Sequence, residues 1–309
     1  MPTIDIHIVE ERKNLSNLVR SLAEQCFLND RDKERAFAMF LKVWEFCSGS
    51  FFFSCYWHEF SDLGHLAAKV ARELNDISRE AQALNELGWI NMEWGHFDRA
   101  ESYFMRAMQK YESLNDIRSQ CRTLRYLGVL AYERKDLETA FSYYRNALEV
   151  TTNEQKKISR EDGEIWNMWK FSEAELHNLL GIYYLDKLEL STSYQELQLA
   201  IALFRSIDDP SFEYYQADPL LNLGKWYSVQ QDYLHAKQYY QESLDLSWKL
   251  HRTDTISRVL LLFAQIAEAE GDDPKAIALA TEAEQTAGIE ITVTREAAAQ
   301  FKERLLQKH

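Results

Sequence analysis

The spacing of apolar and small residues repeats along the chain and predicts a series of paired helices. The same helix-turn-helix pattern occurs in residues 83–108, ALNELGWINMEWGHFDRAESYFMRAM, and again in residues 123–148, TLRYLGVLAYERKDLETAFSYYRNAL. Self-similarity at a fixed period is typical of stacked repeats, because one repeat cannot bury its apolar face without its neighbours. The pattern therefore predicts a helical array rather than a globular domain.

Three columns of small residues extend this register to the end of the chain. The intervals between successive members are uneven but identical in every column, so we expect insertions to fall between repeats. Small side chains are expected where two helices approach to within about 8–10 Å. The columns are Gly88, Gly128, Gly181, Gly224 and Ala264, then Ala100, Ala140, Ser193, Ala236 and Ala276, then Ala107, Ala147, Ala200, Ser243 and Ala283.

The Leu-Gly pairs at 87–88 and 127–128, with a later small residue, an aromatic and a second small residue, resemble the tetratricopeptide repeat (TPR) family. Phe104 and Tyr144 are the aromatics, and we expect them to fill the space between neighbouring repeats. The resemblance implies an all-α TPR helical-repeat superhelix, or α-solenoid, with an N-terminal helical region and a C-terminal capping helix. The repeats here, at about 40 residues, are longer than the roughly 34 residues of the TPR motif. Similar lengthened repeats occur in Rap-type regulators, polarity adaptors and the sensor arrays of STAND ATPases.

The same register divides the chain into an N-terminal arm with helices at 1–40, a TPR array at 41–290 and a capping helix at 291–309. Alternation of Ile4, Ile6 and Ile8 predicts an extended arm, followed by helices at 14–28, 32–46 and 52–74. Asn75-Asp76 and Asn115-Asp116 are predicted to cap helices of roughly 17 residues. Within the array we place a degenerate first repeat at 41–76, where Phe60 replaces a small residue, and repeats near 77–116, 117–153, 172–208, 213–252 and 253–288.

Composition narrows the classes of partner. A net charge of −14 disfavours bulk attraction to nucleic acid or anionic membranes. The sequence has no long apolar run and begins without the basic and apolar pattern of a secretory signal, which predicts a cytoplasmic protein without membrane insertion. We expect the four cysteines to be reduced and mostly buried, with a Cys47–Cys55 pair as the alternative.

No sequence motif predicts catalysis or a bound cofactor. The chain has no P-loop, no GxGxxG after a strand, no GxSxG and no kinase signature, so we expect a non-enzymatic protein with no cofactor. Cys55, His58, Asp62 and His65 share one helical stripe. Four ligands along one straight helix cannot converge on a metal ion, which favours a solvated stripe and no metal site.

The resemblance implies that the first helices of successive repeats line a concave, peptide-binding groove. Basic and amide side chains on these helices predict a site for an acidic or carboxylate-bearing segment. The alternative is that the charges pair along the groove with Glu86, Glu133 and Glu175. Candidate residues are Asn85, Trp89, Arg122, Arg125, Tyr126, Asn178, Asn222, Lys225 and Arg258.

The insertion at 151–171 ends in a cluster of large apolar side chains, Trp166, Met168, Trp169 and Phe171. These side chains could lengthen the next helix and cap its apolar seam, or they could form an exposed interface for a partner or for self-association.

Together these features predict a TPR scaffold or adaptor that binds a protein or peptide segment. The alternative is a ligand-switched signalling regulator of the Rap or STAND-sensor type that responds to a peptide or small molecule.

Overall fold

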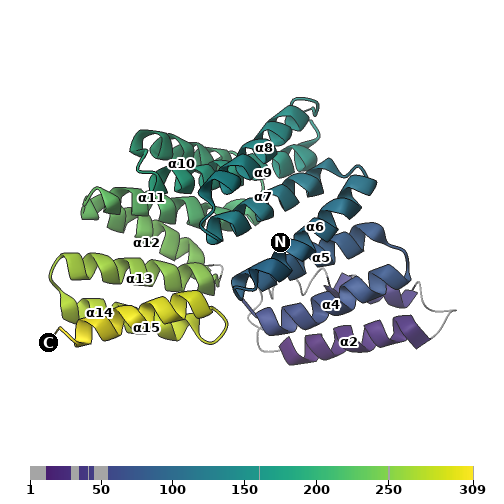
Figure 1. Cartoon of the computed structure of the whole chain (residues 1–309), viewed down its shortest axis with the longest axis horizontal. Coiled ribbons are helices and arrows are strands. Elements are labelled where there is room, and N and C mark those ends of the chain that lie inside the picture. Colours follow the sequence, from purple (N-terminus) through teal and green to yellow (C-terminus); the bar gives the residue numbers. More distant parts are fainter. Residues whose placement is uncertain are drawn as a thin grey trace. The chain divides into compact units, whose positions relative to one another are not determined.

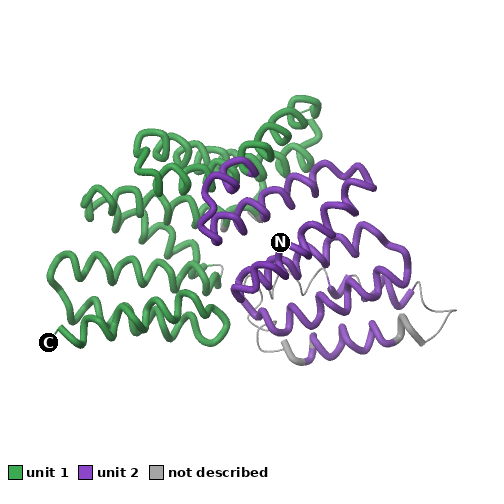
Figure 2. Tube along the Cα trace, viewed as in Figure 1, with its two compact units in different colours: residues 1, 144–309 green, residues 2–143 purple. Residues whose placement is uncertain are grey.

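The computed structural model describes residues 12–28, 35–40, 42–44, 55–159, 161–249 and 251–308. The regular structure in this part of the chain is entirely helical (Figure 1). The helices belong to two compact units, unit 2 at residues 2–143 and unit 1 at residues 144–309 (Figure 2). The division falls within helix α8 (Leu137–Gln155). The fold is therefore the predicted all-α helical-repeat solenoid.

Unit 2 stacks antiparallel helices in chain order. Its helices are α2 (Arg12–Leu28), α4 (Trp57–Glu73), α5 (Ile77–Glu93), α6 (Phe97–Ser113), α7 (Ile117–Glu133) and the first part of α8. Each of α4, α5 and α6 packs on the next helix in the chain, and α5 also contacts α7. Contact between first helices of successive repeats is what brings their side chains onto one surface.

Unit 1 continues the alternation from the second part of α8. Its helices are α9 (Gly163–Asp186), α10 (Leu190–Arg205), the 3-10 segment η1 (Pro210–Gln216), α11 (Ala217–Val229), α12 (Tyr233–Lys249), α13 (Thr253–Ala269), α14 (Asp273–Ala287) and α15 (Thr292–Leu306). First helices α9, α11 and α13 touch in succession, and α15 packs on α14 and α13 at the end of the stack.

The small-residue columns lie at the tightest helix contacts. Every alanine and serine in the three columns is fully buried. A Cβ at Gly88 would lie 2.5 Å from the Phe104 ring, and one at Gly224 would lie 2.4 Å from Tyr240. Phe104 also reaches Tyr126 of the next repeat, with ring centroids 5.6 Å apart. The glycine thus gives the aromatic ring of its own repeat room to span to the neighbouring one.

Two serines replace alanine in these columns without leaving a buried hydroxyl unpaired. Ser193 donates from Oγ to the carbonyl of Gly181 at 2.8 Å, and Ser243 donates to the carbonyl of Ala217 at 2.7 Å. Each bond joins the second helix of a repeat to its first helix. A buried hydroxyl that finds a backbone acceptor stabilises the contact instead of weakening it.

The turns follow the same register. Asp76 and Asp116 accept hydrogen bonds from the backbone N–H of Arg79 and Ser119 at 3.0 and 3.1 Å, which confirms the predicted caps. Inside each hairpin one turn residue has a positive φ, and these residues repeat the uneven intervals of the small-residue columns. They are Gly95, Lys135, Leu188, Gln231 and Gly271.

The N-terminal predictions need one correction. Helix α4 begins at Trp57 rather than at Phe52, because Cys55 lies in a turn with φ of 57°. Cys55 is therefore outside the helical stripe on which His58, Asp62 and His65 are exposed. Phe60 is buried and stacks on Trp44 at 5.6 Å, so the first repeat packs differently from the others, as predicted. The arm at 1–10, Cys47 and the turn at 48–50 lie outside the described residues.

In the described part of the chain, no helix is both long enough and apolar enough to span a bilayer.

Candidate functional site

Helices α5 and α7 of unit 2 bring several predicted site residues together. The rings of Trp89 on α5 and Tyr126 on α7 lie 5.0 Å apart between centroids, and both are partly exposed. The Arg125 guanidinium carbon lies 5.4 Å from the centre of the Tyr126 ring. Stacking of a guanidinium on an aromatic face is favourable. Trp89 and Tyr126 thus form an aromatic surface across two successive first helices, and Arg125, which is 8% exposed, packs beneath it.

Asn85 has a different role from the one predicted. Its side chain is 1% exposed, and its Nδ2 donates to Thr123 Oγ1 at 2.8 Å. Thr123 in turn donates to the backbone carbonyl of Ser119 at 2.8 Å. The Asn85 amide therefore ties α5 to α7 below the surface, while its Oδ1 has no hydrogen-bond partner.

Arg122 and Glu86 face each other with unmet hydrogen-bonding capacity. Arg122 donates from Nη2 to the hydroxyl of Tyr111 at 3.2 Å, but its Nε lies out of solvent without an acceptor. Glu86 accepts from Gln82 Nε2 at 3.2 Å through Oε1, and its buried Oε2 has no donor. Burial raises the pKa of Glu86 to about 7, against the opposing effect of the Arg122 charge and the Gln82 bond.

In unit 1 two predicted asparagines bond each other. Asn222 on α11 donates from Nδ2 to Oδ1 of Asn178 on α9 at 2.9 Å, and both side chains are buried. Next to Asn178, His177 Nδ1 lies 2.5 Å from Glu196 Oε2 on α10. The asparagine pair is thus a link between neighbouring repeats. Lys225, one turn further on α11, is partly exposed.

Arg258 belongs to a charged network that sequence reasoning missed. Its Nη2 donates to Asp254 Oδ2 at 3.0 Å and to Asp218 Oδ1 at 3.3 Å. Arg252, which is 8% exposed, donates to Asp218 Oδ2 at 2.8 Å and to Asp254 Oδ2 at 3.1 Å. Burial acts to raise the pKa of Asp254, but the two arginines hold it at about 2. Two cations and two anions satisfy one another here.

The repeat register contained a signal for this network. One further column, in the part of each first helix that precedes its small residue, holds Gln82, Arg122, Glu175, Asp218 and Arg258. Opposite charges in one column on adjacent helices indicate a pair between repeats. The position of Arg252, in the turn before α13, has no such signal, because the path of the turn brings it to Asp218.

The aromatic end of the insertion lies in the first half of α9, a helix of 24 residues. Trp169 is 5% exposed, and Phe171 packs against Phe204 and Tyr215 with centroids 5.9 and 4.4 Å apart. Lys170 Nζ lies 5.9 Å from the centre of the partly exposed Trp166 ring. Trp169 and Phe171 therefore contribute to the core of unit 1, while Trp166 and Met168 are partly exposed.

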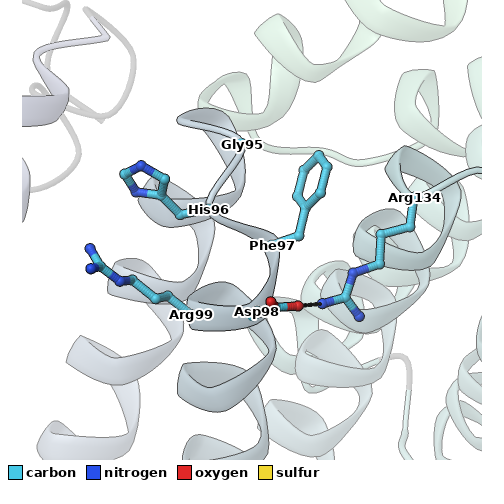
Figure 3. Close-up of a pocket in the computed structure, with 6 residues that line it drawn as sticks. All are labelled: Gly95, His96, Phe97, Asp98, Arg99 and Arg134. Carbon is cyan, nitrogen blue, oxygen red and sulfur yellow. Dashed lines mark hydrogen bonds and ion pairs between the residues drawn. The ribbon is translucent and has the colours of Figure 1, made fainter.

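An open hollow lies at the turn between α5 and α6. It measures about 420 Å³ and is lined by residues 95–99 and Arg134 (Figure 3). Arg134 is ion-paired to Asp98 and Glu101, both at 2.7 Å, and Figure 3 shows His96 and Arg99 pointing away from that pair. Among the residues that the structure describes, no three His, Cys, Asp or Glu side chains are grouped to hold a metal ion.

Helix pairs with a small-residue seam, repeated in register along the chain, are the architecture of tetratricopeptide-repeat proteins. The family model "Tetratricopeptide repeat" matches residues 81–109, which cover most of α5 and α6. No curated protein sequence matches the chain. The likeness of this chain to tetratricopeptide-repeat proteins therefore rests on this repeat and on the fold.

Solved structures with the same fold include two Rap proteins and a STAND ATPase. A Rap protein complexed with Competence and Sporulation Factor has 10% identity and a TM-score of 0.60, over 94% of this chain and 87% of that one. The Rap conjugation gene regulator of plasmid pLS20, in complex with the Phr* peptide, has 11% identity and a TM-score of 0.57, over 95% and 96%. The STAND protein with a TPR sensor from Pyrococcus horikoshii has 19% identity and a TM-score of 0.55, over 92% and 41%. This chain thus spans less than half of that ATPase, and at these identities the likeness is one of fold.

Proposed function

We propose that this protein is a non-enzymatic, cytoplasmic adaptor that holds a peptide segment of a partner protein against helices α5 and α7. One observation carries the proposal. On these adjacent helices, two partly exposed aromatic rings stand beside a charged pair with unmet hydrogen bonds. Aromatic anchors next to precisely oriented polar groups are the usual composition of a recognition surface.

The corresponding surface of unit 1 supports binding less well. Asn178 and Asn222 are occupied by each other, and Arg258 is held by Asp218 and Asp254. A ligand there would have to break buried bonds before it formed new ones, which lowers the net gain on binding. The proposal therefore assigns recognition to Trp89, Tyr126 and Arg122 rather than to the whole predicted set.

A second function, a peptide-responsive regulator, is favoured by one comparison. The pLS20 Rap regulator in complex with the Phr* peptide matches this fold along almost the whole length of both chains. In such a regulator, the ligand must bind one arrangement of the helices more tightly than another. Small-angle scattering that is unchanged by a bound peptide would count against this second function.

Selection from a random peptide library tests the adaptor proposal. The wild type is expected to enrich peptides, and Trp89→Ala combined with Tyr126→Ala is expected to weaken their binding at least about tenfold, because large aromatic anchors dominate interface energies. Trp248→Ala in unit 1 is the matched control, since Trp248 is 50% exposed on α12. Equal binding by the double variant and the control would contradict the proposal, provided that circular dichroism shows both folded.

Self-association through the aromatic insertion is a separate part of the proposal. Trp166 is the member of that cluster whose ring is accessible to a second molecule. Light scattering should show a smaller species for Trp166→Ala if a second copy binds there, and an unchanged mass would exclude this contact.

A further inference from the structure

We propose that the space between Glu86 and Arg122 is a subsite for a primary amide side chain, Asn or Gln, of the bound segment. This inference rests on the proposed function and specifies the partner more closely. It differs from the expectation of an acidic segment, because Glu86 presents an unpaired carboxylate oxygen beside Arg122.

Each of the two side chains has one occupied and one unoccupied end. Gln82 binds Oε1 of Glu86, and Tyr111 binds Nη2 of Arg122. The remaining atoms are an acceptor, Glu86 Oε2, and a donor, the Arg122 Nε–H, and both are shielded from solvent. A buried polar atom without a partner is costly, so the pair favours a group that satisfies both atoms.

The two side chains do not satisfy each other. Within the described part of unit 2, no ion pair or hydrogen bond joins Glu86 to Arg122, although each charge affects the pKa of the other group. Their outer ends are fixed by Gln82 on α5 and by Tyr111 on α6. The bonded atoms of both side chains are therefore held by residues of the repeat scaffold.

A primary amide fits the chemistry of this space better than a charged group. Its carbonyl oxygen can accept from the Arg122 Nε–H, while its NH₂ donates to Glu86 Oε2. A carboxylate would stand beside the Glu86 oxygen, and an ammonium group would stand beside the Arg122 guanidinium, so each charged ligand meets one repulsive neighbour. The donor and the acceptor of a primary amide are separate atoms, so one can bind Glu86 while the other binds Arg122.

Two aromatic rings lie next to the subsite. Glu86 and Arg122 are both partly exposed, so the subsite lies next to the surface that carries Trp89 and Tyr126. Trp89 follows Glu86 by one helical turn, and Tyr126 follows Arg122 by one turn, which places each ring on the same helix face as its polar neighbour. We expect the bound segment to carry an apolar residue next to its Asn or Gln.

The test starts from peptides selected on the immobilised full-length chain. An enriched peptide with Asn or Gln is then made again with the matching carboxylate in that position, Asn→Asp or Gln→Glu. Both affinities are measured by calorimetry at pH 8, where Glu86 is ionised. The amide peptide should bind at least about tenfold more tightly, because the carboxylate leaves Glu86 Oε2 unpaired and repelled. Equal affinities, or enrichment of acidic residues, would overturn the inference.

Variants of the chain separate the subsite from general charge effects. Arg122→Met should weaken the amide peptide about tenfold, whereas Arg118→Met, which removes the same charge from an exposed site on α7, should leave it unchanged. Glu86→Gln should keep the amide peptide bound and reduce its preference over the carboxylate peptide, because the repulsion is gone. A Glu86→Gln variant that retains the full preference would also contradict the inference.

The outcomes also distinguish this inference from the proposed function. Selection of peptides that bind through Trp89 and Tyr126 but have no preferred Asn or Gln would overturn the subsite alone. If the wild type enriches no peptide, the proposed function falls and the subsite with it.

Discussion

Arg122 in unit 2 and Arg258 in unit 1 stand at the same position of their repeats, yet their surroundings differ. Arg258 shares Asp218 and Asp254 with Arg252, so every charge in that group has an opposite neighbour. Arg122 has the Tyr111 hydroxyl and an Nε without an acceptor. The same residue in the same column is a structural tie in one unit and an incompletely satisfied group in the other.

The difference arises from the neighbouring first helix. The column position before Arg258 holds Asp218, which pairs with it directly, whereas the position before Arg122 holds neutral Gln82. The carboxylate that faces Arg122 is displaced by one helical turn, to Glu86. The position of a charged residue within its repeat does not decide whether it is available for a ligand. The residue that faces it from the neighbouring repeat decides this.

Removal of Asp218 should give the largest effect on stability. Asp218→Asn leaves the buried Arg252 with Asp254 as its remaining charged partner in the network, and loss of one partner of a buried pair costs about 3 kcal/mol. Urea denaturation followed by circular dichroism measures this loss. Asp208→Asn, at an exposed position, is the control, and an equal effect of both changes would show that the network contributes little.

Glu86 in unit 2 and Asp254 in unit 1 should contribute to the pH dependence of stability in opposite directions. The folded pKa of Glu86, about 7, lies above its ordinary value of 4.5, so the folded chain holds that proton more strongly than the unfolded chain does. Its contribution to the free energy of unfolding therefore falls as pH rises from 4.5 to 7, by about 2 kcal/mol. Asp254, with a pKa of about 2 against 3.8, contributes stability that is present above 3.8 and is lost as pH falls toward 2.

The Glu86→Gln variant isolates the contribution of Glu86 to the pH dependence of stability. The variant should gain about 2 kcal/mol over the wild type at pH 8 and little at pH 4.5, because only the ionised carboxylate is penalised by burial. Denaturation midpoints of both proteins across this range provide the measurement. A difference that does not change with pH would show that Glu86 is well solvated.

Replacing each arginine separately by methionine compares their contributions to stability. Arg258→Met should cost about 1 kcal/mol, since it removes two ion pairs from a side chain that is 42% exposed. Arg122→Met should change stability by less than about 0.5 kcal/mol, because it also removes an unpaired buried Nε–H. The reverse order in thermal or urea denaturation would indicate that Arg122 is the structural residue.

The hairpin turns provide a further small effect on stability. Leu188 in unit 1 has φ of 58° and is 70% exposed, while the equivalent residue of unit 2, Gly95, has φ of 74°. Leu188→Gly should stabilise the chain by about 0.5–1 kcal/mol, because the left-handed conformation is strained for residues with a Cβ. Gly95→Leu should have the opposite sign, and two changes of the same sign would contradict this explanation.

The sequence by itself determined the architecture of this protein. The apolar period, the small columns and the Asn-Asp turns set the helix pairs, because each feature is local and recurs along the chain. The sequence also identified the first helices as the surface to examine. The predicted start of α4 was wrong, because the positive φ of Cys55 places that residue in a turn before the helix.

Only the tertiary structure decided which candidate side chains are bonded to other residues of the protein. Asn85, Asn178 and Asn222 form buried links between repeats, and Arg258 joins a charged network through Arg252. These outcomes depend on side chains one full repeat away along the chain, whose distances are fixed by packing and not by local pattern. The unpaired atoms of Glu86 and Arg122 have the same origin, because Gln82 and Tyr111 bind the other polar atoms of the two side chains.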